Sequence, residues 1–426
     1  MGKGKKEMLL DSFSKSGNSV EEFKRTITEL SDMTSVLRVN MSDVLLCSKN
    51  DFVEDTEEGK TNVFLINPKN IWDETTTKSG TTFSLNSAFL RHDSFKKADA
   101  MDFLDEFTKK NKLILKIDGK GYFTSDALPK TLGSRIGLTG ISKPCVERDL
   151  HIASRLNKNE PIKLVVRYQD NIRKVFATMS NLYAYVPQTF MCDVLDAINT
   201  DEKLGKMECT SWFITNEFSE IYLEFPEKAK EISDAYKLTD DLIPGLYLCT
   251  SDTGNSSILI RATWRMKNSK LLFGESRRKH MGSVDTSKLL EEVEKVFFAE
   301  YVSLPEKLCD LMLQDITDPT WSKIPEKAFI AKNEVAVKGT LKKIFNEIDV
   351  VGAIGKKNEK EIFEQLVDEN DYVISYTAYD IVKQVMTLPE RCSGLTEASK
   401  CALGKACAKA PFVDLQKPEP KKVVLT

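Results

Sequence analysis

Histidine is scarce in this sequence, and the cysteines follow no regular spacing. The 426 residues include three histidines and nine cysteines, with no Cys-x-x-Cys pair and no closely spaced pair of histidines. A closed zinc site is built from such pairs, so we predict that the chain has no metal site. An odd number of cysteines without a disulfide framework is typical of free thiols, which favours a cytoplasmic protein.

Long apolar runs are also missing. After MGKGKKE the N-terminus has only Met8, Leu9 and Leu10 as an apolar run, whereas a signal peptide needs roughly 7–15 such residues. Lys6 stands where a myristoylation motif has Ser or Thr. No segment approaches the roughly 18 apolar residues of a membrane span. We therefore expect no secretion signal, no lipid anchor and no membrane partner.

The sequence has no excess of either charge. Lys and Arg number 61, Asp and Glu number 64, and the net charge is −3. A near-neutral protein has no global field that attracts nucleic acid, so such binding has to come from a local basic patch. The chain is 41% hydrophobic, as is ordinary for a globular protein, and its length predicts two or three domains of roughly 150 residues.

Motifs for the common catalytic chemistries are absent or incomplete. Asp252-Thr253-Gly254 resembles an aspartic-protease loop, but the second triplet that such an enzyme needs is missing. A polar turn with Gly254 at positive φ explains it better. Gly119-Lys120-Gly121 is a poor dinucleotide fingerprint, and residues 352–357 lack the spacing and hydroxyl of a phosphate loop, so we predict a hairpin and a loop there.

The enzyme question stays open, although a non-enzyme is favoured. No nucleophile elbow is present, and no cysteine has a local sequence that indicates activation. An active site would have to be assembled from residues that are distant in the sequence. We predict no cofactor.

Residues 1–144 are predicted to form an N-terminal α/β segment. Ser19 begins a capping box, and the apolar spacing that follows predicts a helix over 20–31. Strand signals occupy 42–66, and a second helix is predicted over 95–109. Asp118-Gly119 is typical of the turn of a β-hairpin.

Residues 145–284 carry the strongest strand signals and are predicted to form a central β-rich domain. A helix is predicted over 188–198. Alternation of side chains is clearest in the last long strand, where one face carries Ile258, Ile260, Ala262, Trp264 and Met266. The predicted strands are 162–168, 172–178, 212–214, 221–223, 246–249 and 258–266.

From about residue 285 the pattern becomes helical. Helices are predicted from 285 onward and around 305–315, 338–348, 359–368, 375–387 and 396–409, in a helical region that spans 285–410. Residues 411–426 are predicted to be an extended, mobile tail. The predicted fold class is therefore α+β, with a central, mostly antiparallel sheet region and a helical C-terminal region.

Basic residues cluster on the central strands. Arg261 and Arg265 are predicted to share the strand face opposite Trp264. Arg167 and Lys174 face each other if Asp170-Asn171 forms a two-residue turn. The predicted nucleic-acid-binding residues are Arg261, Arg265, Arg277, Arg278, Lys279, Arg167, Lys174 and Tyr183.

A basic sheet with interleaved aromatic residues suits single-stranded nucleic acid, which needs neutralised phosphates and stacked bases. The alternative is that these charges keep a sheet face solvated and pair with local carboxylates. The sequence leaves both interpretations open.

Several central segments are similar to those of a known family. Arg167-Tyr168, a short turn and residues 173–183 resemble a strand pair that ends in Ser-x-x-Tyr, and 245–256 resembles a strand, a turn and a return strand. Residues 264–268 resemble an arginine segment that follows. The family is an uncharacterised one carried by phages and plasmids, the domain of unknown function 932, and the resemblance spans roughly 145–282.

This sequence departs from the family pattern at several positions. Thr250 stands where the family often has Asn, and Met266 or Lys267 stands where it has Cys. The N-terminal Pro-Trp-His motif of many members is absent. The resemblance implies a mobile-element protein in the cytoplasm of a host cell and implies no particular activity.

These observations lead to two hypotheses from different classes. The first is a phage- or plasmid-encoded, non-catalytic protein that binds single-stranded DNA as an accessory of replication or recombination. The second is a protein–protein interaction role, such as a virion component or an inhibitor of host defence, with a host or phage protein as partner. Near-neutral charge suits protein contacts. The sequence leaves the oligomeric state open, so an oligomer is allowed.

Overall fold

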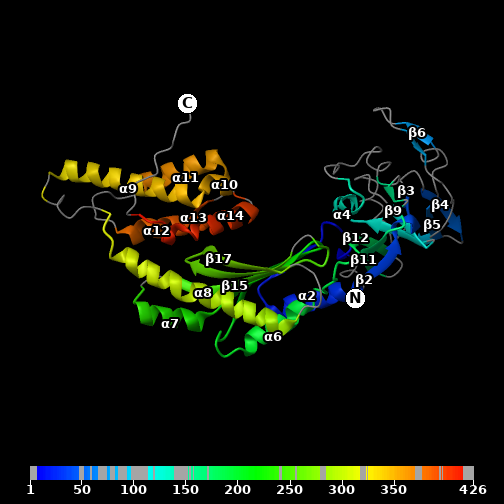
Figure 1. Ribbon diagram of the computed structural model, residues 1–426, viewed down its shortest axis with the longest axis horizontal. Helices are drawn as coiled ribbons and strands as arrows, with labels where there is room; N and C mark the ends of the chain where they lie inside the picture. The colour runs from blue at the N-terminus through cyan, green and yellow to red at the C-terminus, as the bar shows by residue number, and fades with distance from the viewer. Residues whose placement is uncertain are drawn as a thin grey trace.

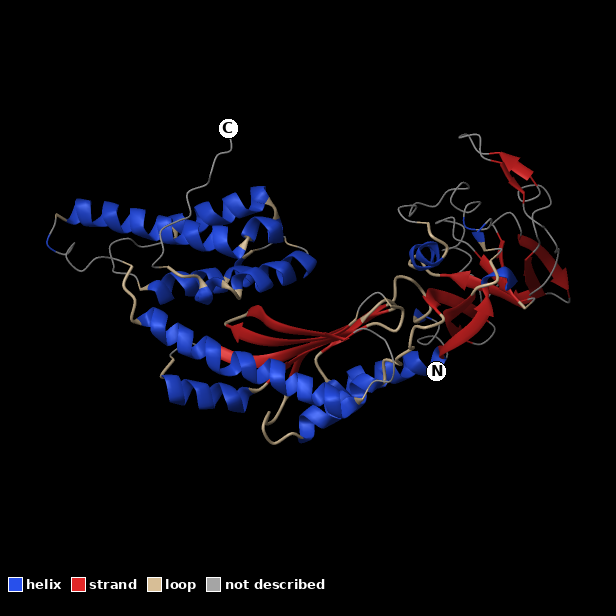
Figure 2. Ribbon diagram, in the orientation of Figure 1, coloured by secondary structure: helices blue, strands red, loops and turns tan. Residues whose placement is uncertain are grey.

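The described part of the chain contains two six-stranded sheets, two smaller sheets and a layered set of helices (Figures 1 and 2). Five short strands lie between residues 52 and 96: β4 (Phe52–Glu57), β5 (Lys60–Leu65), β6 (Glu74–Thr76), β7 (Thr82–Ser84) and β8 (Ser94–Lys96). Besides these strands, the computed structural model describes residues 7–47, 114–118, 120–138, 152, 155–156, 158–169, 172–238, 242–254, 257–278, 285–316, 323, 325–369, 377–392, 395 and 397–415.

The first sheet is antiparallel throughout, and five of its six strands, β13 to β17, are consecutive in the chain. Its order is β1 (Ser14–Gly17), β13 (Glu208–Thr215), β14 (Ser219–Glu224), β15 (Leu242–Thr250), β16 (Ile258–Met266) and β17 (Ser269–Arg278). The predicted strands of the central region are all present. In β16, the five residues predicted to share one face are all buried in the hydrophobic cores.

The second sheet is mixed, because β10 pairs with β12 in parallel while its other pairs are antiparallel. Gln169 pairs with Ile172 and Ile117 pairs with Lys120, so the strands of both predicted hairpins pair in the expected register. The strand order is β2 (Thr34–Asn40), β11 (Pro161–Gln169), β12 (Ile172–Ser180), β10 (Lys120–Thr124), β9 (Ile114–Ile117) and β3 (Val44–Cys47).

Both sheets contain strands from the two sides of the predicted domain boundary at 144/145. The hairpin β11–β12 lies between β2 and β10, and β1 completes the edge of the first sheet next to β13. The boundary therefore does not fall between two sheets. Strands β1 and β2, from the start of the chain, hydrogen-bond to the backbone of the later strands β13 and β11. The order of strand signals along the sequence does not reveal this pairing.

Helices near the N-terminus form where local signals predict them. The helix predicted over 20–31 is α2 (Val20–Met33), and its N-cap Ser19 accepts a hydrogen bond from the Glu22 amide at 3.3 Å. The helix predicted over 188–198 is α6 (Phe190–Thr200). The remaining helices of this part are α4 (Leu128–Arg135), α7 (Pro226–Tyr236) and the 3-10 turn η1 (Met41–Asp43).

The C-terminal part is helical, as predicted. Its elements are α8 (Thr286–Met312), α9 (Glu326–Ile348), α10 (Val350–Ile354), α11 (Lys356–Asp368), α12 (Ala378–Met386), α13 (Leu388–Arg391), α14 (Glu397–Cys407) and the 3-10 turn η4 (Ala410–Phe412). These helices follow an antiparallel sheet, which confirms the α+β fold class.

Four local predictions need correction or fall partly outside the description. A separate helix at 305–315 is wrong, because α8 continues through Pro305. The loop predicted at 352–357 is instead α10 and the start of α11, separated at Gly355 with φ of 84°. Pro411 is buried and Val413 is 5% exposed, so the tail does not begin at 411, and residues beyond 415 lie outside the described part. Of the helix predicted over 95–109, residues 95 and 96 lie in β8 and the others are not described.

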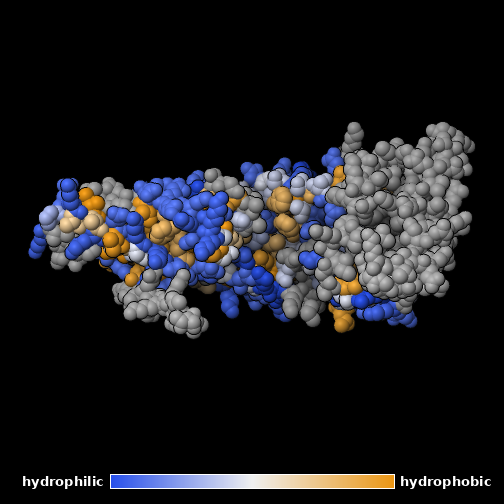
Figure 3. Space-filling view, turned by 90° about the horizontal axis from the view of Figure 1, so that it is seen from above, coloured by the Kyte–Doolittle hydropathy of each residue, from blue (hydrophilic) through white to orange (hydrophobic). Residues whose placement is uncertain are grey.

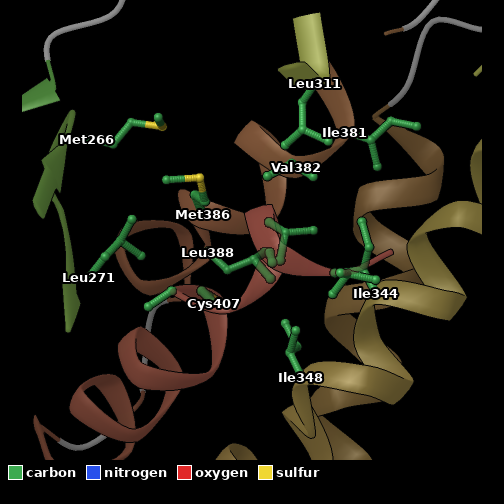
Figure 4. Packing of buried hydrophobic residues seen from close by; sticks show 14 of the residues in the cluster. Met266, Leu271, Leu311, Ile344, Ile348, Ile381, Val382, Met386, Leu388 and Cys407 are labelled. Atoms are coloured by element: carbon green, nitrogen blue, oxygen red, sulfur yellow. The ribbon is translucent and has the colours of Figure 1, made fainter. Parts of the chain in front are cut away.

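Helices cover both faces of the antiparallel sheet (Figure 1). α8 runs along one face, α12 to α14 lie over the other, and α9 to α11 form a further layer above them. The largest hydrophobic core joins these layers. Figure 4 shows Met266 and Leu271 of the sheet facing Met386 and Leu388, with Ile344 and Ile348 of α9 on the far side.

Candidate functional site

A row of aromatic and basic residues crosses the sheet face opposite α8. Tyr222 pairs with Tyr247, and Tyr247 pairs with Arg261, so three neighbouring strands place these side chains side by side. The ring centroids of the two tyrosines are 4.7 Å apart. We call this surface the charged face; it carries Tyr222, Tyr247, Arg261, Arg265 and Lys270 with the carboxylates of Glu220, Glu224 and Glu275.

Gly245 allows the sheet to curve toward the charged face. A Cβ at this position would lie 2.2 Å from the Leu223 carbonyl oxygen and 2.6 Å from Thr263 Oγ1. Across β15, Arg265 of β16 bonds both oxygens of Glu224 in β14, at 2.7 and 3.1 Å. Adjacent strands are about 4.8 Å apart in a flat sheet. The contact between alternate strands therefore reflects a concave face, which the absence of a side chain at Gly245 permits.

Curvature also explains the position of Lys270. Its Nζ donates to Ser211 Oγ of β13 at 2.8 Å, although three strands lie between β17 and β13 in the sheet. The same Nζ lies 4.2 Å from the centroid of the Tyr222 ring. Burial lowers the pKa of Lys270, although the nearby carboxylate of Glu224 acts in the opposite direction.

The arginines of the charged face are paired with carboxylates. Arg261 is 4% exposed and its Nε donates to Glu275 at 2.9 Å, while Arg265 bonds Glu224. Arg261 and Arg265 therefore share one strand face, as predicted, and carboxylates of that face pair with both. A bulge explains the first pair: between Ile260 and Ala262 the register shifts, and Gly274 with φ of 47° leads directly to Glu275.

The basic residues that follow Arg265 are more exposed. Arg277 is 62% exposed and bonds the second oxygen of Glu275. Arg278 forms an ion pair with Glu292 of α8 at 2.7 Å. These arginines therefore pair with local carboxylates, which is the alternative interpretation that the sequence left open. Lys279 lies outside the described residues.

One part of the charged face has more cations than carboxylates. Lys405 of α14 approaches Arg261 and Arg277: burial is the largest cause that lowers its pKa, and the charges of both arginines lower it further. Among the described residues, Glu275 is the carboxylate that interacts with these cations. Three cations on one carboxylate leave a surplus of two positive charges. We call Arg261, Arg277, Lys405 and Glu275 the cationic cluster.

Lys405 was not among the sequence-predicted site residues. Its helix was predicted at about 396–409, but nothing local in the sequence indicates that α14 lies against β17. Gly404 makes this approach close, since a Cβ there would lie 2.6 Å from the Lys270 carbonyl oxygen. Gly404, within a predicted helix, is the one local signal that indicates close packing.

The other three predicted residues, Arg167, Lys174 and Tyr183, lie at the junction of the two sheets. Arg167 and Lys174 pair across β11 and β12 as predicted. A bulge at Phe176, between the pairs Val166–Val175 and Val165–Ala177, brings its ring to the same side. The ring centroid lies 4.4 Å from Arg167 Cζ and 5.5 Å from Lys174 Nζ.

Arg167 is fully buried, so its predicted role as a phosphate contact is wrong. One of its terminal nitrogens donates to both carboxylate oxygens of Asp252, at 3.1 and 3.0 Å, and its Nε donates to Thr34 Oγ1 at 3.2 Å. Asp252 is 2% exposed and comes from the turn of the first sheet, where Gly254 has the predicted positive φ, 77°. The turn prediction is confirmed, and the aspartate in it is a buried counter-ion.

Lys174 is buried in the same way. It is 1% exposed, and its Nζ lies 3.0 Å from an Asp11 oxygen in the segment that precedes β1. The prediction that Lys174 contacts phosphates is therefore also wrong. Two segments that are distant in the sequence bring carboxylates onto β11 and β12. Tyr183 is half-buried nearby: burial raises the pKa of its hydroxyl above the usual range, and the charge of Asp252 adds to this effect.

A cleft of about 270 Å³ opens beside this junction. The N-terminal segment, the turn between β10 and α4, and the turn between β13 and β14 form its walls. Its lining includes five Ser or Thr hydroxyls, three phenylalanine rings and the carboxylates of Asp11, Asp126 and Glu217.

A metal site and a membrane span receive no support from the described residues. Among them, no group of three or more His, Cys, Asp or Glu side chains is placed to hold a metal ion. The three histidines all lie outside the described part, so the prediction about metals stays a prediction. Of the described helices, none combines the length and the apolar character needed to cross a bilayer.

Comparison with known proteins adds no relative. No protein-family model matches the chain. No curated protein and no solved structure matches it either.

Proposed function

We propose that this chain is a non-catalytic protein that binds single-stranded nucleic acid, with the cationic cluster contacting phosphates. The observation that carries the proposal is the surplus charge: Arg261 and Arg277 share the carboxylate of Glu275, and Lys405 lies close enough to interact electrostatically with these three residues. Gathering three cations where one is neutralised costs electrostatic energy, which a bound phosphate offsets.

The geometry favours an extended anion over a buried small one. Arg277 is 62% exposed and lies at the end of β17, so a chain of phosphates has access to it. Tyr222, half-buried beside Lys270, is the aromatic residue of the charged face that remains partly accessible, whereas Tyr247 is 6% exposed. Stacking on such rings is sequence-tolerant, which suits non-specific single-strand binding.

The proposed context is a phage or plasmid protein that assists replication or recombination in the cytoplasm of a host cell. The resemblance to the domain of unknown function 932 supports this context. A non-catalytic role is consistent with the described residues, whose buried acids and bases are neutralised by each other at the sheet junction.

A double charge reversal tests the proposal. Arg277→Glu with Lys405→Glu changes the cluster from a surplus of positive charge to a surplus of negative charge. We expect binding of a fluorescent oligo(dT) to weaken at least about tenfold, and the slope of log K against log salt to fall by about 0.7 for each lost phosphate contact. Fluorescence anisotropy at several salt concentrations measures both.

Lys230→Glu with Lys295→Glu is the matched control, because both lysines are exposed on helices α7 and α8, away from the cluster. It makes the same change in net charge and should alter the slope far less. Equal losses in the two variants, or a wild-type chain that does not bind oligo(dT), would contradict the proposal. Circular dichroism checks that each variant is folded.

A protein partner is the second candidate, favoured by exposed apolar side chains on consecutive helices. Leu313, at the end of α8, is 87% exposed, and Val335 of α9 is 72% exposed. Figure 3 shows apolar residues among hydrophilic ones over the helical region. Copurification of a host or phage protein without nucleic acid, lost on Leu313→Ser with Val335→Ser, would support this role over the first.

A further inference from the structure

We infer that Ser211 is a covalent acceptor site, a serine that Lys270 activates as a general base toward activated acyl esters such as thioesters. Acylation of one serine is a stoichiometric modification, so it goes beyond the binding function proposed above and is compatible with a non-catalytic chain. Neither residue belongs to the cationic cluster, and the acyl transfer does not require nucleic acid.

Ser211 and Lys270 lie within the distance that proton transfer requires. Lys270 Nζ is 2.8 Å from Ser211 Oγ, and a general base acts over about 2.6–3.2 Å. The ionised lysine donates to the hydroxyl, whereas the neutral amine can accept the hydroxyl proton instead. A serine hydroxyl is a weak nucleophile without such a base, and a lysine performs this role in Ser–Lys pairs on several folds.

A β-bulge presents Ser211 on the charged face. The pairing of β13 with β14 shifts register between Cys209 and Ser211, and Ser211 then pairs with Tyr222. Bulges re-aim side chains and are common next to reactive sites. Ser211 and Lys270 are both half-buried, so a small donor has access to them. Half-buried rings of Tyr222 and Phe213 lie beside Ser211 on the same face and offer an apolar surface to an acyl chain.

The surroundings of Lys270 favour its neutral form. Burial is the largest cause that lowers the pKa of its ammonium group, and the positive charge of Arg265 acts in the same direction. Arg265 also bonds both oxygens of Glu224, which weakens the pull of that carboxylate on Lys270. The groups that favour the charged lysine are Glu224, Cys209, Glu220 and the Tyr222 ring. The net pKa is lowered, so Lys270 is more often a neutral base than an exposed lysine is.

The acyl transfer balances in atoms and charge. Neutral Lys270 takes the hydroxyl proton as Ser211 Oγ attacks the carbonyl carbon of the donor, and a serine ester forms. The bond between that carbon and the leaving group breaks, and the departing thiolate or alcoholate takes the proton from the Lys270 ammonium. No oxidant or reductant is needed.

Two probes test the inference on the full chain. We expect a fluorescent fluorophosphonate, which reacts with base-activated serines, to give an adduct that peptide mass spectrometry maps to Ser211 and that Ser211→Ala removes. We expect p-nitrophenyl acetate to release a burst of about one p-nitrophenolate per chain and to block later fluorophosphonate labelling. Labelling of Ser211 without this burst would overturn the assignment to acyl donors.

Lys270→Arg keeps a positive charge beside Ser211 but cannot accept its proton, so fluorophosphonate labelling should be about a hundredfold slower. The wild-type rate should rise with pH and level off below the ordinary lysine pKa, because the neutral amine is the active form. Lys270→Arg should lack this rise. Lys267→Arg makes the same change at an exposed position in the turn before β17 and should label at the wild-type rate.

Two results would overturn the activation of Ser211. One is a wild-type adduct that maps to residues other than Ser211, or no adduct at all. The other is a labelling rate for Lys270→Arg equal to that of the wild-type chain, with circular dichroism showing that the variant is folded. The first result needs no variant, so it decides the matter even if a substitution disturbs the sheet.

Discussion

The junction of the two sheets holds an almost completely buried ion pair. Arg167 and Asp252 are 0% and 2% exposed, and their mutual bonds replace the water that both charges lose. Such a pair adds little stability relative to an apolar pair, but removal of one partner leaves an uncompensated charge in a dry environment. The two members of the pair therefore depend on each other for stability.

Asp252→Leu should lower the free energy of unfolding by about 3–5 kcal/mol, because it leaves the Arg167 guanidinium buried without its carboxylate. The double variant Arg167→Met with Asp252→Leu should recover much of that loss. Urea denaturation measures both. Lys357→Met is the control: Lys357 is 88% exposed in its pair with Glu361, so this change should cost less than about 0.5 kcal/mol. A loss for Asp252→Leu as small as that of the control would exclude a buried-charge penalty.

Strand β15 depends on a residue without a side chain. Gly245→Ala would place a Cβ 2.2 Å from the Leu223 carbonyl oxygen, so β14 and β15 must separate. We expect a loss of about 1–3 kcal/mol in the free energy of unfolding. Gly339→Ala in α9 should instead stabilise the chain by up to about 1 kcal/mol, because its Cβ meets nothing within 4 Å and alanine is the better helix former. Thermal unfolding of the two variants should shift in opposite directions; shifts of the same sign would contradict the curvature argument.

Elements with local signals were predictable, and their partners were not. The pairing of the strands that flank 118–119 and 170–171, the cap at Ser19 and the alternation in β16 all follow from neighbouring residues. The insertion of β11–β12 between β2 and β10 depends on contacts between residues as far apart as Thr34 and Arg167, 133 positions, for which one sequence offers no periodic signal.

The site shows the same limit. Arg261 and Arg265 were correctly placed on one strand face, but the carboxylates that neutralise them come from β17 and β14, and Lys405 comes from α14. Arg167 and Lys174 were correctly placed opposite each other, yet Asp252 and Asp11 bury them from two other segments. Side-chain direction follows from local period, whereas burial and pairing follow from the assembled fold.

At the scale of the whole molecule, tyrosine ionisation links stability to alkaline pH. Burial raises the pKa of tyrosine hydroxyls in the mixed sheet, at the sheet junction, on the charged face and on α8. For Tyr122, burial and the hydrogen bond to Tyr168 raise the pKa to about 12. A folded-state pKa above the unfolded value of about 10 means that the folded chain retains protons that the unfolded chain loses.

The free energy of unfolding should therefore be constant with respect to these groups below pH of about 10 and fall as pH rises from there through about 12. Chemical denaturation at a series of pH values measures the decline, and absorbance of tyrosinate reports ionisation during unfolding. Tyr122→Phe removes one titrating hydroxyl and should make the decline less steep, even if its stability near neutral pH is lower. Two results would show that the fold does not protect the hydroxyls. One is a decline for Tyr122→Phe as steep as that of the wild-type chain. The other is full tyrosinate absorbance at pH of about 10 in the folded protein.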